Sequence, residues 1–316
     1  MKGKVRNAVS LALFVLLLGA LGAVVYLYRE DMASLFALKW QEAALLLALS
    51  LAGCLFNCLY HRLLLEACGV KLRLVDWVGV VFVTNAVAYV LPMRADLMVS
   101  AAYYKRVKGL AYTKSASLAA GNVVFGTAFA LMEMLLSLLL SGIFKGLWPL
   151  ALWVFCAVCS VGLGVFVYLA LRFSHGQSRL IRRFGLVRGV AEGFCELMEN
   201  RRLLLRLLLC TVGSHAVHLV LYMQCFASMG LTVAPYEALL SNSISRLSTI
   251  VAVVPGNVGI REAVMGAAMS LLGSPFLNGF AVSLLQRVSV MVAYAVGGLG
   301  FAYPVWRKWK NGRADA

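Results

Sequence analysis

The chain has 316 residues, of which 62% are hydrophobic and only 13% are charged, against about 25% charged residues in an average soluble domain. Its mean hydropathy is +0.87. A soluble globule of this size cannot bury so many apolar side chains, and a disordered chain would combine low hydrophobicity with high charge. The composition therefore predicts one all-α polytopic membrane domain over residues 1–316.

The net charge of +16 comes from 29 basic and 13 acidic residues. Most basic residues, 22 of the 29, lie in the two tails, in the breaks at 62–74 and 105–114, and in the stretch 172–206. This is the positive-inside pattern of membrane proteins and not the basic face of a nucleic-acid-binding domain. This charge pattern excludes nucleic acid as a partner. It also predicts that both termini lie on the cytoplasmic side of a bacterial-type inner membrane.

Six apolar segments reach the length of about 20 residues that a transmembrane helix needs. They are residues 8–28, 42–61, 113–141, 147–171, 203–229 and 276–304. The first is longer than the apolar core of a signal peptide, which has about 7–15 residues, so we expect it to be retained. Between the fourth and fifth spans, residues 172–202 mix arginines with apolar residues at helical spacing. This predicts an amphipathic segment on the anionic membrane surface.

The apolar stretch at 74–107 conflicts with the charge pattern, because basic breaks that favour the cytoplasm flank it on both sides. A single span would place those breaks on opposite sides of the membrane. A re-entrant hairpin resolves the conflict, and Pro92 would end its first arm because proline interrupts a helix. The alternative is one long kinked span at which the charge rule fails.

A second hairpin is predicted at 235–273, with a break at Pro255 and an expected entry from the opposite side. In both stretches an apolar arm is followed by a proline, then an arginine and a carboxylate, and then a shorter arm. Two oppositely oriented broken helices form an inverted repeat, which secondary transporters use to build a site in the middle of the membrane.

Several ionisable residues lie at membrane depth, where each arginine costs about 2.5–3.5 kcal/mol and usually faces a bundle interior or cavity. They are Arg94, Asp96, Glu133, Arg246, Arg261, Glu262 and Arg287. One interpretation is structural: Arg94 pairs with Asp96, Arg261 pairs with Glu262, and each acid lies in the first turn of a second arm. The other interpretation is functional, and the arginines form a site for an anion.

The functional interpretation is that a lipid phosphate binds at the hairpin tips. Arginine suits phosphate because it donates two parallel hydrogen bonds and stays charged, and helix N-termini bind anions. The residues expected around the headgroup, besides the arginines, are Asp96, Pro255, Gly256, Asn257, Gly259, Glu262 and Gln286. Gly256 and Gly259 would let a ligand approach the backbone, although a tight turn alone also explains glycines.

Three further residues are candidates for coupling to protons. His215 and His218 lie one helical turn apart on the span 203–229, and Glu133 is a lone acid in its span. The histidines otherwise form helix-to-helix hydrogen bonds, and Glu133 otherwise pairs with an arginine. No catalytic, metal or cofactor motif is found, and the C-x-x-C at Cys156 and Cys159 is expected to be apolar filler.

The run Val254-Pro-Gly-Asn-Val-Gly-Ile-Arg-Glu-Ala263 resembles the Pro-Gly-Gly-x-Gly-x-Arg-Glu-Ala motif of the lysylphosphatidylglycerol synthase transmembrane region, or flippase-like domain, family. Leu91-Pro-Met-Arg-Ala-Asp96 resembles its earlier Leu-Pro-x-Arg-x-Gly-Glu motif, and Arg62 and Arg287 also fit its pattern. The resemblance covers nearly the whole chain. The departures are Asn257 for glycine, Ala-Asp for Gly-Glu, and residues 121–127, where the family often has an arginine and an aspartate.

The resemblance implies a stand-alone flippase-type domain, because residues 1–316 leave no room for the soluble synthase domain of other members. Its implied partners are membrane lipids of the family, namely phospholipids, polyprenyl-linked sugars and hopanoids. Three hypotheses follow: a transporter of anionic or modified lipids, a lipid-modifying membrane transferase with Glu262 or Asp96 as its base, and a scaffold for a lipid-modifying enzyme.

Overall fold

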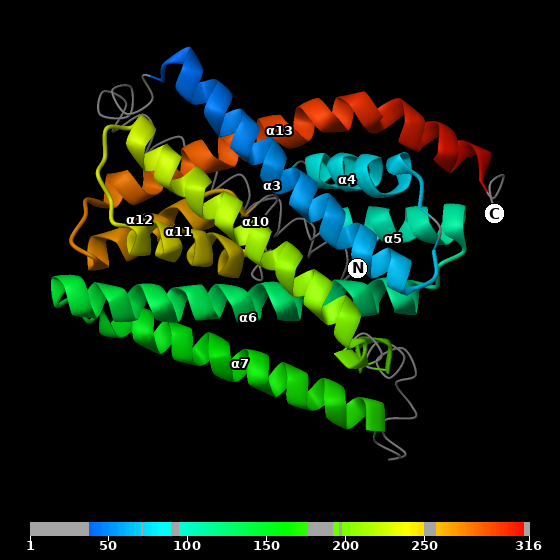
Figure 1. The fold of residues 1–316 in the computed structure, drawn as a ribbon, viewed down its shortest axis with the longest axis horizontal. Coiled ribbons are helices and arrows are strands. Elements are labelled where there is room, and N and C mark those ends of the chain that lie inside the picture. Colours follow the sequence, from blue (N-terminus) through cyan, green and yellow to red (C-terminus); the bar gives the residue numbers. More distant parts are fainter. Residues whose placement is uncertain are drawn as a thin grey trace, which may run out of the picture.

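The computed structural model describes residues 38–70, 72–89, 95–175, 192–195, 198–249 and 257–312. Regular structure within these ranges is helical throughout (Figure 1). Five helices are long and apolar enough to cross a membrane. They are α3 (Trp40–Ala67), α6 (Tyr112–Lys145), α7 (Leu150–His175), α10 (Arg201–Ser228) and α13 (Phe276–Asn311).

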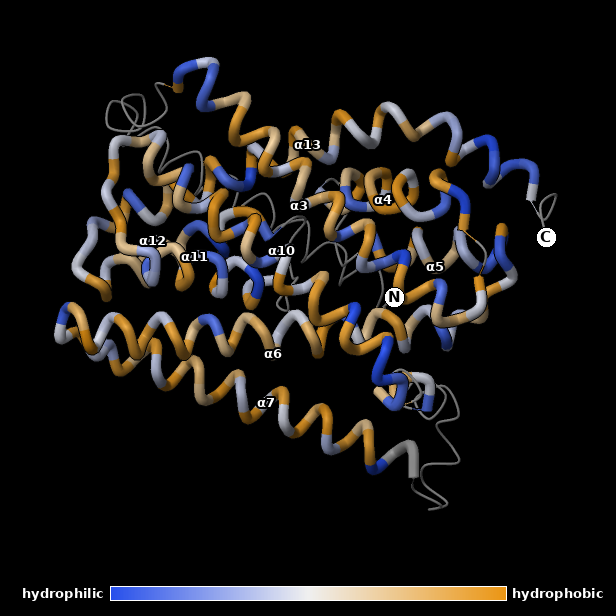
Figure 2. Tube along the Cα trace, in the orientation of Figure 1, coloured by the Kyte–Doolittle hydropathy of each residue, from blue (hydrophilic) through white to orange (hydrophobic). Residues whose placement is uncertain are grey.

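These five helices confirm five of the six predicted spans and the all-α class. Apolar residues dominate their middle turns and polar residues gather at their ends (Figure 2), as the hydrophobic thickness of a bilayer requires. α3 and α13 extend furthest beyond their predicted ends, α3 past residue 61 to Ala67 and α13 past residue 304 to Asn311. The predicted span 8–28 and most of the predicted amphipathic segment 172–202 lie outside the described residues.

The two predicted hairpin regions form short helices that lie toward opposite ends of the bundle (Figure 1). One pair contains the short π-helical turn η1 (Val75–Gly79), which continues as α4 (Val80–Ala88), and α5 (Ala95–Lys108). The other contains α11 (Pro235–Ser248) and α12 (Ile260–Leu271). A helix of 14 residues is about 21 Å long, short of the roughly 30 Å of hydrocarbon. The connections at 90–94 and 250–256 lie outside the described residues.

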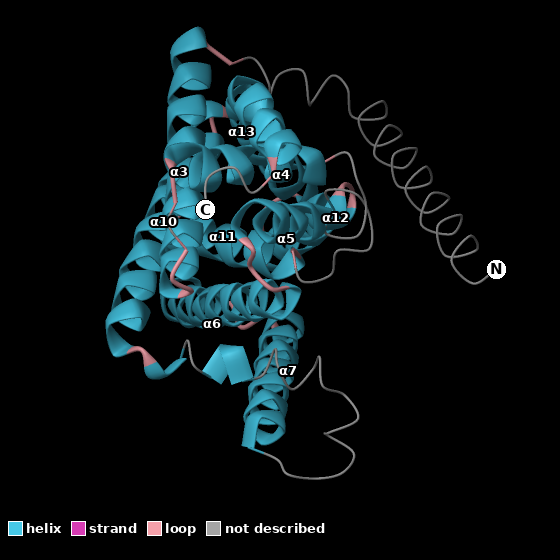
Figure 3. Ribbon diagram, turned by 90° about the vertical axis from the view of Figure 1, so that its right-hand side faces the viewer, coloured by secondary structure: helices cyan, strands magenta, loops and turns pink. Residues whose placement is uncertain are grey.

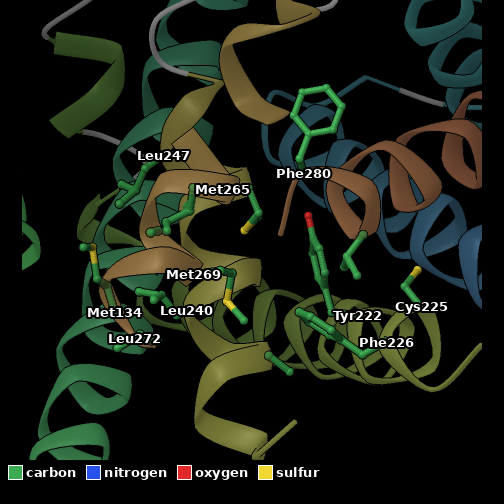
Figure 4. Close-up of a cluster of buried hydrophobic side chains, with 14 of the residues drawn as sticks. Met134, Tyr222, Cys225, Phe226, Leu240, Leu247, Met265, Met269, Leu272 and Phe280 are labelled. Carbon is green, nitrogen blue, oxygen red and sulfur yellow. The ribbon is translucent and has the colours of Figure 1, made fainter. Parts of the chain in front are cut away.

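The short helices pack against the long ones. α4 lies against α13, α11 against α6, and α12 against α13, while α10 crosses α3. The largest apolar cluster joins α6, α10, α11, α12 and α13, and Figure 4 shows part of it. Tyr222 and Phe226 of α10 are fully buried there, as is Met265 of α12. This cluster fixes α11 and α12 inside the bundle.

Polar contacts fix the start of the second pair to the end of α6. Lys145 Nζ lies 2.6 Å from Glu237 Oε1, while the other oxygen of Glu237 accepts a hydrogen bond from the Ala234 amide at 2.9 Å. Ser137 Oγ donates to the Tyr236 carbonyl oxygen. A buried acid in the first turn is stabilised both by the helix dipole and by this lysine.

α7 has a different environment from the other long helices. It packs against α6 and lies beneath it in both Figure 1 and Figure 3, away from α3 and α10. Its outer face carries large exposed apolar side chains, among them Val154, Val158 and Val161. Such a face suits contact with lipid acyl chains and not with water.

Close packing of α4 on α13 depends on Gly297, because a Cβ atom there would overlap the buried ring of Phe82. We expect Gly297→Ala to lower the free energy of unfolding by about 1–3 kcal/mol, the usual effect of overpacking. Gly300→Ala is the matched control, since nothing lies within 4 Å of its added Cβ. Thermal unfolding of the detergent-solubilised proteins measures both. Equal stability of the two variants would contradict the prediction.

Candidate functional site

A cavity of about 310 Å³ is lined by residues of the two pairs of short helices and of α3, α10 and α13. This volume is at the lower end of the range of about 300–1,000 Å³ that is usual for ligand sites. Seven residues predicted from the sequence as site or coupling residues line it. They are Asp96, His218, Arg246, Asn257, Arg261, Gln286 and Arg287. The structure therefore brings together residues from α5, α10, α11, α12 and α13 that are up to 191 positions apart.

Arg287 is the most tightly bound of the three arginines. Its Nε lies 2.6 Å from Glu262 Oε1, and its Nη2 donates to the Asn257 carbonyl oxygen at 3.0 Å. The second oxygen of Glu262 accepts a hydrogen bond from the Gly259 amide at 2.8 Å. Glu262 is fully buried, so this network joins the start of α12 to α13 and neutralises one arginine.

Arg261 has a weaker carboxylate contact, since its Nε lies 3.7 Å from Glu262 Oε1. Its Nη1 donates to Ser245 Oγ at 3.2 Å and its Nη2 to the Ser283 carbonyl oxygen at 2.9 Å. The predicted pairing of Arg261 with Glu262 is thus secondary, because the fold places Arg287 closer to this carboxylate. The short hydrogen bonds of Arg261 go to neutral acceptors, so a carboxylate balances its positive charge only weakly.

Arg246 is held by neutral groups. Its Nη2 donates to Ser214 Oγ at 3.2 Å and lies 3.1 Å from His218 Nδ1. Among the described residues, no carboxylate oxygen comes within 4.0 Å of this guanidinium group. A half-buried arginine without a close carboxylate is a strong attractor for an anion that enters the cavity.

Amide, hydroxyl and imidazole groups that the sequence analysis did not select line the rest of the cavity. They include Asn57, His61, Asn85, Tyr89, Asn122, Ser248, Thr249 and Tyr294. The detectable signal in the sequence is a spacing of four residues, or of twice four, within apolar segments: Asn57 is four residues before His61, Asn85 is four before Tyr89, and Gln286 is eight before Tyr294. Residues four apart lie on one face of a helix, so each helix turns one polar stripe toward the cavity.

The position of His218 depends on the absence of a side chain on α3. A Cβ atom added at Gly53 would lie 2.7 Å from His218 Cε1. α10 can therefore cross α3 closely while the imidazole stays between Ser214 and Arg246. This role of Gly53 could not be predicted from the sequence, because a glycine in an apolar helix carries no sign of its partner.

Residues 7–298 match the family described as lysylphosphatidylglycerol synthase TM region. The chain belongs to this family. No curated protein and no solved structure matches it significantly. The family and the five apolar helices make the chain a multi-pass membrane protein connected with lipid modification.

The family match confirms the resemblance predicted from the two motifs, and the structure refines the roles of their residues. Asp96 and Glu262 lie in the first turns of α5 and α12, as predicted. Gly259 has a φ of 84°, so the turn requires glycine there, and its amide is already bonded to Glu262. One N–H group at this helix end is therefore already bonded to a carboxylate, and the binding of a ligand there stays a prediction. Arg94, Pro255 and Gly256 lie outside the described residues.

The remaining predicted residues, Glu133 and His215, meet in a buried cluster. His215 Nδ1 lies 2.9 Å from Glu133 Oε2, and Asn242 Nδ2 lies 3.2 and 3.0 Å from the two carboxylate oxygens. The edge of Phe129 covers the imidazole. Glu133 thus pairs with a histidine and not with an arginine, and the fold supplies the nearby acid that the sequence did not reveal.

The described part of this family member holds no group of three or more histidine, cysteine or acidic side chains suited to a metal ion. All eight cysteines lie within that part, and none of them is in a disulfide. Cys156, of the C-x-x-C pair, is buried on α7 among apolar residues. Its environment fits the predicted role of apolar filler.

Proposed function

We propose that the chain is a flippase-like protein that holds an anionic or modified lipid headgroup between its two hairpins and moves it across a bacterial-type inner membrane. The observation that carries this proposal is the cavity in which Arg246, Arg261 and Arg287 meet. Glu262 neutralises Arg287, so the other two guanidinium groups remain to balance the charge of a phosphate.

The polar stripes support a headgroup larger than a bare phosphate. Asn57, Asn85 and Gln286 offer both donors and acceptors, and Tyr89 and Tyr294 offer hydroxyl groups. Such groups suit the glycerol of a phospholipid or the sugar of a polyprenyl-linked lipid, and hopanoids with polar headgroups have the same requirement. The acyl or prenyl chains would stay in the bilayer, against apolar faces such as that of α7.

The arrangement of the short helices supports a pair of re-entrant hairpins related by an inverted repeat. η1, α4 and α5 lie toward the end of the bundle where α3 finishes and α6 starts, whereas α11 and α12 lie toward the other end (Figure 1). Basic residues such as Lys108, Lys114 and Lys308 belong to the first end, which the charge rule places in the cytoplasm. Lys39 and Lys145 belong to the second.

Alternating access is the mechanism that this arrangement supports. Headgroup binding on one side would be followed by movement of one hairpin relative to the other around a fixed midplane site. Glu262, a candidate base in the enzyme hypothesis, is fully buried and bonded to Arg287 and Gly259. This favours binding over acid–base chemistry at that residue.

The first test is native mass spectrometry of the lipids that co-purify with wild type and with Arg246→Ala. Loss of one charge-assisted contact, worth about 1.5–3 kcal/mol, should weaken retention of a phosphate-bearing lipid about 10- to 100-fold. Arg62→Ala is the matched control, because Arg62 is exposed and pairs with Glu66. It should retain the lipid as wild type does.

Transport is tested with the same variants in liposomes, by following the accessibility of the identified lipid, carrying a fluorescent label, to a membrane-impermeant quencher. Wild type should move the lipid between leaflets, and Arg246→Ala should be slower by a similar factor. Bulk lipid on both proteins and no movement by wild type would contradict the proposal and favour a scaffold. A change in the lipid's mass during incubation would favour a transferase.

A further inference from the structure

The Glu133–His215–Asn242 cluster is a second buried polar group, separate from the lining of the cavity. Glu133 and His215 are 6% and 3% exposed, and Asn242 is buried as well. The three side chains come from α6, α10 and α11. An ionisable pair at this depth is costly and is retained mostly where charge or protons move.

This cluster is physically joined to the anion-binding wall. On α11, Asn242 lies one turn before Arg246, and on α10, His215 lies next to Ser214 and one turn before His218. Ser214 and His218 are the groups that contact Arg246. α10 and α11 therefore carry groups of both sites, about one helical turn apart along each helix.

The pair changes charge when it loses a proton. With one proton, either as acid and neutral imidazole or as carboxylate and imidazolium, its net charge is zero. Without that proton its net charge is −1, and this negative charge partly neutralises Arg246 and repels an anion in the cavity. Anion binding and proton binding are then linked, and each strengthens the other by the same factor.

We propose that Glu133 and His215 form a proton-binding site that couples proton uptake to the binding of the anionic headgroup beside Arg246. The inference rests on the proposed function for its ligand, but the proton site itself is defined by the buried pair. Coupling of this kind would let a transmembrane proton gradient drive the lipid in one direction.

Other ionisable groups surround the pair, and their charges enter the coupling. Glu237 and Lys145 form a separate neutral pair toward the end of α6, and Glu262 with Arg287 forms another. The remaining groups near Arg246 and the histidines are His218 on α10, Arg261 on α12, Cys54 on α3, Tyr222 on α10 and Tyr294 on α13. Among these groups, the pair of Glu133 and His215 is the one that joins a buried carboxyl group to an imidazole.

The test compares wild type, Glu133→Gln and Glu237→Gln as full chains in phosphatidylcholine nanodiscs. Glutamine keeps the size of the acid and an acceptor for Asn242 but cannot change charge. Glu237→Gln is the matched control, a buried acid on α11 that contacts Lys145 instead. The probe is dihexanoylphosphatidylglycerol, because its phosphodiester keeps one negative charge over the pH range used.

Isothermal titration calorimetry in two buffers of different ionisation enthalpy gives both the affinity and the number of protons taken up. Wild type should take up as much as one proton per probe, and its affinity should fall at least about fivefold as the pH rises through the pair's transition. Glu133→Gln should take up none and bind at all pH values about as wild type does at low pH. Glu237→Gln should behave as wild type does.

Proton uptake that is absent in wild type, or unchanged in Glu133→Gln, would overturn the inference. If the probe binds to no variant, the anion site fails as well, and infrared difference spectra decide the proton site separately. A protonated-carboxyl band or an imidazolium band that follows pH in wild type and is changed or missing in Glu133→Gln supports the site. Absence of both bands in wild type overturns it.

Discussion

Replacing Glu262 with alanine is expected to lower the free energy of unfolding by about 3–5 kcal/mol, because the change leaves a buried charge without its partner. Glu262 is fully buried, and only 5% of the Arg287 side chain is exposed. The alanine variant also loses the acceptor for the Gly259 amide at the start of α12. Both losses fall at the junction of α12 with α13.

Chemical or thermal unfolding in detergent, followed by circular dichroism, measures this loss. Glu66→Ala is the matched control, since Glu66 pairs with Arg62 four residues away on an exposed face, where such pairs contribute less than about 1 kcal/mol. Glu262→Gln should cost less than Glu262→Ala, because an amide oxygen still accepts from Arg287 or Gly259. Equal stability of Glu262→Ala and Glu66→Ala would show that the network is not a structural centre.

The long helices were predictable because their cause is local. A continuous run of about 20 apolar residues has few alternatives to a transmembrane helix, so the helices at 40–67, 112–145 and 201–228 agree with the predicted spans to within six residues at each end. The first-turn positions of Asp96 and Glu262 were also predictable from a local cause. A proline stands before each of the two short helices in the sequence and marks where a helix can begin.

The pairing of charged residues was not predictable, because it depends on how helices approach each other. Sequence proximity favoured Arg261 as the partner of Glu262, but packing of α12 on α13 brings Arg287 closer. The contact of Glu133 with His215 joins residues 82 positions apart, and no local pattern announces it. The polar stripes around the cavity were partly predictable. Their spacing could be seen in the sequence, but the cavity that they share could not.

Asp76 is the clearest residue that the sequence analysis missed. Its carboxylate is fully buried and receives Lys108 Nζ, Lys308 Nζ and Tyr103 Oη, each at 2.9 Å, together with the Arg73 amide at 3.0 Å. An acid at the start of an apolar stretch predicts only a helix terminus. Its two lysines are 32 and 232 positions away, so their convergence follows from the fold.

We expect Asp76→Ala to lower the free energy of unfolding by about 3 kcal/mol, since two lysines lose a shared buried carboxylate. The loss should be smaller than for Glu262→Ala, because Lys108 and Lys308 are 11% and 18% exposed and can turn toward water. Unfolding of Asp76→Ala, Lys308→Met and the double variant measures the coupling. The losses should be clearly non-additive, and additive losses would contradict the shared contact.

The Asp76→Ala variant also distinguishes two parts of the first pair of short helices: the end that is joined to α13 and the end that lines the cavity. Asp76 lies in η1 and joins α5 to α13, whereas Asp96 lines the cavity at the other end of α5. Asp76→Ala should therefore lose stability while its folded fraction retains the co-purifying lipid that Arg246→Ala loses. If Asp76→Ala loses the lipid as well at a temperature where it stays folded, the contact between α5 and α13 sets the shape of the headgroup site. The lysines on Asp76 would then control access to the cavity as well as stability.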